Sequence, residues 1–184
     1  MTYGFVKELI LPNIGSQIMR KINQIEKSKF ITIFNNIFEN SSWIAEELYY
    51  LKPFENFDDL KSKMLSVFEN TNYENQLKVI KNHPDLANKT KISNLSKESL
   101  NEQKKSQLDQ CTDEEYKEFH HLNDKYKEKF GFPFILAVSG KSKIEILDIF
   151  RSRYLSDLND ELNQAKKQVL KIAELRLNEI KENY

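Results

Sequence analysis

The sequence is poor in the residues that interrupt or crosslink a chain. Its 184 residues include one cysteine, four glycines and four prolines. A single cysteine, Cys111, excludes an internal disulfide and is typical of a reducing compartment. So few glycines and prolines leave long uninterrupted segments, which favour helices over a hairpin-rich sheet.

The sequence also lacks an excess of charge of either sign and a long hydrophobic run. Its 28 basic and 28 acidic residues balance, so the chain has no general electrostatic attraction to nucleic acid or to an anionic membrane. The apolar run within residues 5–14 is too short to span a bilayer, and Glu8 and Pro12 interrupt it. We therefore expect a cytoplasmic protein with no nucleic-acid and no membrane partner.

Apolar residues at helical spacing are abundant. Phe30, Ile33, Phe34, Ile37 and Phe38 form one face of a helix. Similar patterns and capping signals predict a helix from residue 43 that Pro53 ends, one ending near residue 82, and others over about 57–68, 96–109, 113–130, 142–154 and 157–183. The prediction is an all-α fold, a single compact domain of about eight helices, with residues 1–28 as an arm or short helix on the main body.

One stretch departs from the helical pattern. Residues 132–138 form a continuous apolar run in which Pro133 forbids a position inside a helix. We expect an extended, buried segment here.

Usable chemistry is concentrated between His83 and Gln103. Because Pro84 disfavours the α conformation of the residue before it, we expect His83 on an extended corner. A rigidly held imidazole suits general acid–base catalysis near neutral pH. The alternative is a loop histidine that caps a helix end. Asp85 would orient the imidazole in the first case and cap the next turn in the second.

Ser99 and Glu102 have the spacing of a helix capping box. Ser96 is the better N-cap, however, and with that cap Ser99, Glu102 and Gln103 project from one side of a helix. A hydroxyl, a carboxylate and an amide on one side suit a planar ureide-like ligand rich in N–H and C=O groups.

Arg153 is the expected partner from elsewhere in the chain. It shares the inner side of its helix with Ile146 and Ile149, which favours a buried, carboxylate-binding role; the alternative is a side chain that reaches solvent. No zinc-type ligand set and no glycine-rich phosphate loop occurs in the sequence. The residues alone thus predict a cofactor-free helical domain with a His/Glu/Arg pocket and no metal.

Six motifs occur together in a familiar order. They are FENSSWIAE (38–46), KPF (52–54), HPDLA (83–87), SxxEQ (99–103), FGFPFI (130–135) and Arg153. In this order and spacing the chain resembles the OHCU decarboxylase family over about residues 22–180. The resemblance implies a domain over 22–184 and leaves residues 1–21 outside as the arm.

The resemblance implies an all-helical, homodimeric enzyme that needs no cofactor. Such enzymes decarboxylate 2-oxo-4-hydroxy-4-carboxy-5-ureidoimidazoline (OHCU) to (S)-allantoin in urate degradation. It implies catalytic roles for His83, Glu102 and Arg153. Substrate contacts are implied for Pro84, Ser99, Gln103, Phe134, Ile135, Leu136, Ala137 and Val138.

Other classes remain open on the sequence alone. These are a helical ligand-binding or interaction module, an inactive family member, and a cofactor-free hydrolase of a related ureide. Convergence of His83, Glu102 and Arg153 on one cavity of small-molecule size would separate the enzyme from the module.

Overall fold

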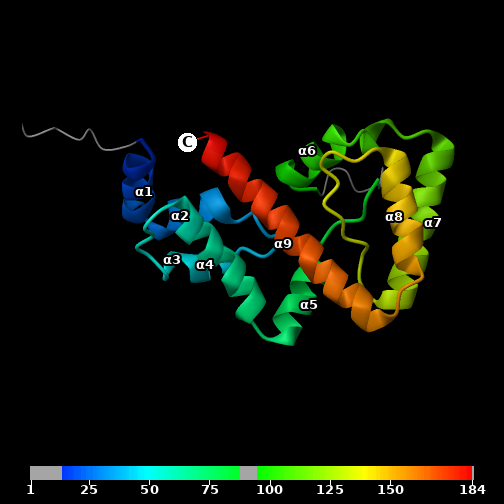
Figure 1. The fold of residues 1–184 in the computed structure, drawn as a ribbon, viewed down its shortest axis with the longest axis horizontal. Helices are drawn as coiled ribbons and strands as arrows, with labels where there is room; N and C mark the ends of the chain where they lie inside the picture. The colour runs from blue at the N-terminus through cyan, green and yellow to red at the C-terminus, as the bar shows by residue number, and fades with distance from the viewer. Residues whose placement is uncertain (1–13, 88–94, 184) are drawn as a thin grey trace, which may run out of the picture.

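The computed structural model describes residues 14–87 and 95–183, which are mostly helical (Figure 1). Within them lie nine α-helices and one short 3-10 helix: α1 (Ile14–Gln24), α2 (Lys27–Phe34), α3 (Trp43–Tyr49), α4 (Phe57–Asn70), α5 (Tyr73–Lys81), α6 (Lys97–Lys105), η2 (Leu108–Gln110), α7 (Asp113–Phe130), α8 (Lys143–Tyr154) and α9 (Leu158–Asn183). These ranges contain no β-strand. The all-α prediction is confirmed, and α1 accounts for the ninth helix.

The long helix α9 joins the two ends of the fold. In Figure 1 it crosses from the side of α7 and α8 to the side of α1 and α2, and along the way it contacts α4 and α5. Its inner face is buried at Leu162, Ala165, Val169 and Ile172. The same apolar spacing predicts that Leu158 faces inward, but Leu158 is exposed at the first residue of the helix. One hydrophobic cluster therefore runs through the molecule, with residues from α1 to α9 as members.

Helix α2 is shorter than its apolar pattern suggested. It ends at Phe34, and residues 35–40 form turns that close with Asn40 at φ +48°. Ile37 and Phe38 are nevertheless buried, because the turn folds back onto the core. The next residue, Glu39, is buried as a consequence.

Helix α6 also ends early. The predicted helix to residue 109 is wrong beyond Lys105, because Gln107 adopts a left-handed conformation (φ +57°) and η2 follows. Ser106, at the break, donates its hydroxyl to the carbonyl oxygen of Val138 at 2.8 Å. The chain therefore turns where it contacts the segment 132–138.

The segment 132–138 is buried, as expected, and it lies outside any helix. Gly131 ends α7 with φ +77°, a conformation that favours glycine. All seven residues that follow are buried and lie outside helices and strands. We call residues 132–138 the strip.

The N-terminal part of the chain is described from residue 14. Helix α1 crosses the boundary expected between residues 21 and 22, and it packs on the core through Met19 and Ile22. Residues 1–13, which hold most of the predicted arm, lie outside the described ranges. None of the described helices combines the length and apolar character needed to cross a bilayer.

Candidate active site

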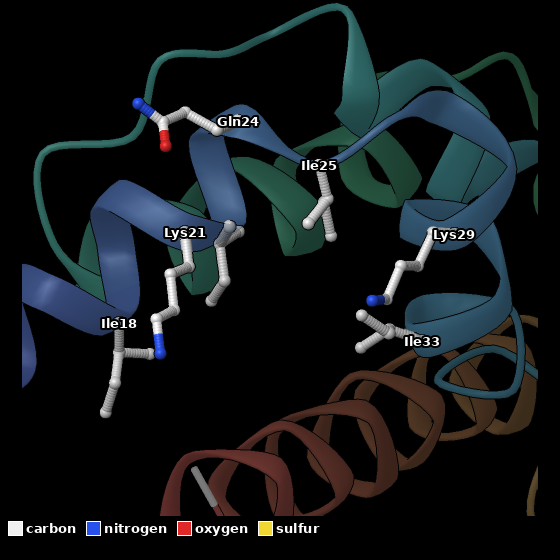
Figure 2. Close-up of a pocket in the computed structure, with 7 residues that line it drawn as sticks. Ile18, Lys21, Gln24, Ile25, Lys29 and Ile33 are labelled. Carbon is white, nitrogen blue, oxygen red and sulfur yellow. The ribbon is translucent and has the colours of Figure 1, made fainter.

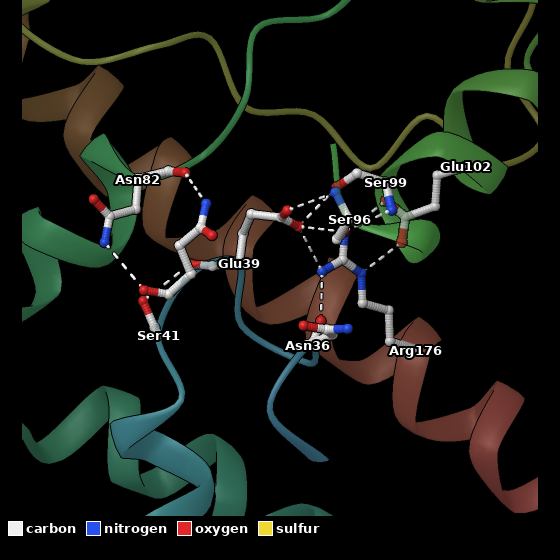
Figure 3. A network of polar contacts seen from close by, with 9 residues as sticks. Asn36, Glu39, Ser41, Asn82, Ser96, Ser99, Glu102 and Arg176 are labelled. Carbon is white, nitrogen blue, oxygen red and sulfur yellow. Dashed lines mark hydrogen bonds and ion pairs between the residues drawn. The ribbon is translucent and has the colours of Figure 1, made fainter. Parts of the chain in front are cut away.

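A buried arginine of α9, Arg176, lies at the centre of the candidate site (Figure 3). Its Nε and Nη2 donate to the two carboxylate oxygens of Glu102 at 2.7 and 3.0 Å. Nη1 donates to the carbonyl oxygen of Asn36 at 2.7 Å and to Glu39 at 3.1 Å. Nη2 also donates to the hydroxyl of Ser99 at 2.9 Å. A guanidinium has five N–H groups, so protein acceptors occupy all of them.

Glu39 is the second buried charge of this cluster. Its carboxylate accepts the hydroxyls of Ser99 at 2.7 Å and Ser96 at 2.9 Å in addition to Arg176. Burial opposes its ionisation, but the charge of Arg176 and the hydrogen bond from Ser99 outweigh burial and lower the pKa of Glu39. The turn after α2, the start of α6 and the C-terminal half of α9 are thereby joined.

Helix α6 presents the predicted polar side chains from one side. The side chain of Ser96 accepts the N–H of Ser99 at 3.1 Å, so Ser96 is confirmed as the N-cap. Ser99, Glu102 and Gln103 then lie inside the helix. Ser99 and Gln103 are buried, whereas the side chain of Glu102 is 22% exposed.

His83 lies in a bend after α5, outside any helix, as expected. It is half-buried and close enough to Glu39 and Arg176 to feel their charges. Burial, and then the positive charge of Arg176, lower the pKa of His83 to about 4, against an opposing effect of Glu39. The imidazole is therefore neutral at pH 7.

The turn after His83 is fixed from α6 and α7. Gln103 accepts the backbone N–H of Ala87 at 2.9 Å, and Ala87 has the unusual φ of +51°. Asn123 donates to the carbonyl oxygen of Leu86 at 2.9 Å. Asp85, which follows Pro84, pairs with Lys127 at 2.9 Å. These contacts hold the corner that carries the imidazole.

A cavity of about 220 Å³ opens beside the Arg176–Glu102 pair. Its walls include Glu102, Arg176, Ala137, Val138, Ser139 and Lys105. Within the described part of the chain no protein acceptor takes the backbone N–H of Val138. The cavity is thus lined by the Glu102 carboxylate and by Val138, whose N–H has no acceptor among the described residues.

A larger hollow of about 480 Å³ lies elsewhere, between α1 and α2 (Figure 2). Isoleucines 18, 22, 25 and 33 line it together with Lys21, Gln24 and Lys29. It contains none of the predicted site residues and no carboxylate, so we place the chemistry at the smaller cavity, which Glu102 lines. The residues that line this smaller cavity do not include His83.

Arg153 does not join this cluster. Its guanidinium pairs with Glu161, near the start of α9. Glu161 and Arg176 stand fifteen residues apart on α9, or about 22 Å along the helix axis at 1.5 Å per residue. The structure therefore brings His83, Ser99, Glu102 and Gln103 to one region and places Arg153 at another.

Sequence reasoning missed Glu39 and Arg176. Both carry a signal in the pattern, since Arg176 follows Ile172 at the i+4 position of an apolar stripe and Glu39 follows the buried Phe38. A charge where the pattern requires a core residue indicates a buried partner. The partners of each come from distant segments, so the sequence alone does not identify them.

Among residues 14–87 and 95–183, no three histidine, cysteine, aspartate or glutamate side chains are grouped so that they could hold a metal ion. The acidic groups of the candidate site are instead paired with Arg176.

The fold and the site define an all-helical domain with a small polar cavity built on a buried arginine–carboxylate network. Within that class the chain belongs to the OHCU decarboxylase family, whose sequence pattern matches residues 23–178. The resemblance seen in the motifs is thereby confirmed.

Individual relatives agree with this assignment. The chain is 34% identical over 161 residues to a 2-oxo-4-hydroxy-4-carboxy-5-ureidoimidazoline decarboxylase of Haloferax volcanii, covering 88% of this chain and 94% of the relative. It is 40% identical over 162 residues to a uric acid degradation bifunctional protein of Bacillus sp. strain TB-90. That match covers 88% of this chain but only 32% of the relative, so the chain spans about a third of the bifunctional protein's length.

A solved structure shares the fold. The crystal structure of an (S)-allantoin synthase superposes with a TM-score of 0.69 at 25% sequence identity, covering 88% of this chain and 53% of the other.

Proposed function

We propose that this protein decarboxylates OHCU to (S)-allantoin in urate degradation. Family membership over residues 23–178 supports the reaction, and the cavity beside Glu102 and Val138 supports the site. Among the contacts of single residues, the strongest support is the pair of hydrogen bonds from Arg176 to Glu102 at the cavity wall.

Glu102 is the proposed contact for the ureido group. Each of its oxygens accepts one N–H from Arg176, which leaves about half of the four lone-pair sites of the carboxylate for a ligand. Ureido N–H groups are matching donors. Because all five N–H groups of Arg176 are occupied, Arg176 acts in this proposal as a positioning residue that orients Glu102.

The proposal includes two further contacts. Gln103 uses its carbonyl oxygen on Ala87, so its amide N–H₂ is the group available to a ligand. The N–H of Val138 would donate to a ring carbonyl. Ser99 contributes indirectly, because its hydroxyl donates to Glu39. Pro84 contributes by following His83 in the turn that carries the imidazole.

The substrate supplies its own acceptor for electrons. When the bond to CO₂ breaks, its electron pair forms a C=C bond to the neighbouring ring carbon. The electrons of that carbon's C=N bond move to the nitrogen, which takes up a proton. The hydroxyl proton then moves to the neighbouring ring carbon as the hydroxyl becomes a carbonyl. His83, neutral at pH 7 because its pKa is lowered to about 4, is suited to accept the hydroxyl proton and return it to one face. General acid–base catalysis of this kind contributes typically about 10²–10⁴-fold.

The proposal is tested with purified protein and OHCU generated in situ, by following (S)-allantoin by circular dichroism. We expect His83→Asn and Glu102→Gln each to lower the rate by about 10²-fold or more. The exposed His120, changed to Asn, is the matched control and retains the wild-type rate. Racemic allantoin at the uncatalysed rate from the wild-type protein would overturn the proposal and leave an inactive binding module as the function.

We further propose that the protein acts in the cytoplasm as a homodimer, as the family resemblance implies. The balanced charge and the single cysteine support the compartment. Light scattering at two protein concentrations tests the assembly; a monomer at both would contradict it.

A further inference from the structure

The strip is held by side chains of three separate elements. Each anchor fixes one backbone group: Arg153 Nη1 of α8 donates to the carbonyl oxygen of Ile135 at 2.6 Å, Gln168 of α9 accepts the N–H of Ala137 at 2.9 Å, and the Ser106 hydroxyl donates to the carbonyl oxygen of Val138 at 2.8 Å. No sheet ladder fixes the strip, so these anchors set the direction of its backbone groups.

The anchor at Arg153 is itself held in place. Arg153 Nε donates to the two oxygens of Glu161 at 3.0 and 3.2 Å, and Glu161 is fully buried. Tyr126 donates its hydroxyl to the same carboxylate, and burial together with this hydrogen bond raises the pKa of Tyr126 so that it stays neutral. The guanidinium also lies over the ring of Phe134, 4.6 Å from its centroid.

The far end of the strip reaches the candidate active site. Ala137 and Val138 line the cavity beside Glu102, only two and three residues beyond the carbonyl that Arg153 holds. The N–H of Val138 has no acceptor among the described residues. A shift of the strip would therefore change where this donor points.

We propose that Arg153, held by Glu161, is a positioning residue that fixes the strip so that the N–H of Val138 points into the cavity. The inference rests on the proposed function, because it treats this N–H as a substrate contact. It differs from a substrate-binding role for Arg153, since the guanidinium acts through the backbone of the strip and touches no ligand. Removing one pre-oriented donor from a developing charge costs about 10²–10³-fold in kcat, so partial misalignment has a measurable effect.

A role of the Arg153–Glu161 pair in stability alone predicts a different result from a positioning role. Removing one partner of a buried ion pair typically costs about 3–5 kcal/mol of stability whatever the role of the pair, so stability alone does not reveal why the pair is present. Positioning instead predicts a change in catalysis at temperatures where every variant is folded, together with a local change in the strip.

The experiment compares the variants Arg153→Met and Arg153→Lys with the wild-type protein, each as the full chain. The control is Arg151→Met on the same helix, because Arg151 is exposed and its ion pairs with Glu118 and Asp148 lie on the surface. Two quantities are measured well below the unfolding temperature: kcat and KM for (S)-allantoin formation, and hydrogen exchange of peptides that cover residues 132–139 and, as a reference, 57–70.

For Arg153→Met we expect faster exchange in 132–139, unchanged exchange in 57–70, and kcat/KM at least about tenfold lower. Arg153→Lys keeps the charge and restores part of both quantities, and Arg151→Met matches wild type in both. Normal kcat/KM with faster exchange, or lost activity with unchanged exchange, overturns the positioning role. If the wild-type protein lacks the activity, the proposed function fails, and exchange alone then decides whether Arg153 holds the strip.

Discussion

At the scale of single residues, the environment of His83 decides its chemistry. Burial and the charge of Arg176 favour the neutral imidazole, and Glu39 opposes them only in part. A neutral imidazole accepts a proton readily, whereas an imidazolium cannot. The same neighbours that build the site thus set the proton state in which His83 works.

The lowered pKa of His83 makes stability depend on pH. Between the ordinary value of 6.5 and about 4 the unfolded chain takes up a proton at His83 and the folded protein does not. Stability is therefore expected to fall as pH drops through this window. Urea unfolding at several pH values measures the slope.

His83→Asn should flatten that slope, and His120→Asn is the control at an exposed histidine. An NMR titration in which the His83 imidazole protonates at or above 6.5 would contradict the lowered pKa.

At the scale of elements, the N-cap residue of α6, Ser96, makes two hydrogen bonds with different roles. Ser96 caps the helix by accepting the N–H of Ser99 and donates its own hydroxyl to the buried Glu39. Ser142 caps α8 in a similar way, but its carboxylate partner, Glu145, is exposed. The two caps therefore differ in the burial of the carboxylate that accepts the serine hydroxyl.

Ser96→Ala should destabilise the protein by more than Ser142→Ala. Loss of a cap costs about 1 kcal/mol, and Ser96→Ala also removes a donor from a buried carboxylate, which adds about 1–3 kcal/mol. Thermal unfolding of the two variants gives the comparison. Equal losses would show that the contact with Glu39 contributes no stability.

At the scale of the whole molecule, Arg176 joins segments that are far apart in the chain. Its partners lie in the turn after α2 and in α6, while Arg176 lies in α9. Without the guanidinium, Glu39 would remain as a buried charge with no cation. The loss of one partner of a buried ion pair typically costs about 3–5 kcal/mol.

Arg176→Met is therefore expected to destabilise the protein by about 3–5 kcal/mol, measured by urea unfolding. The double variant Arg176→Met/Glu39→Gln should recover part of this loss, because Glu39 no longer leaves an unpaired charge in the core. The surface change Arg151→Met should cost less than about 1 kcal/mol. No recovery in the double variant would mean that Arg176 stabilises by packing alone.

Several features were determined by local sequence signals. Apolar periodicity and the scarcity of glycine and proline determined the helical class, and the N-cap Ser96 was predicted and confirmed. Local signals of the same kind, the cap Thr112 and Gly131, mark the two ends of α7. Pro133 excluded a helix in the strip. These signals act within a few residues, so neighbouring sequence is sufficient to specify them.

Tertiary structure decided which charges meet. Arg153 and Arg176 each extend an apolar helix face, and nothing local distinguishes them. Their surroundings in the folded chain distinguish them. Arg153 of α8 meets Glu161 at the start of α9, whereas Arg176, further along α9, meets Glu39 in the turn after α2 and Glu102 of α6. Burying a charge is tolerable only beside its partner, and packing across the whole chain determines which partner that is.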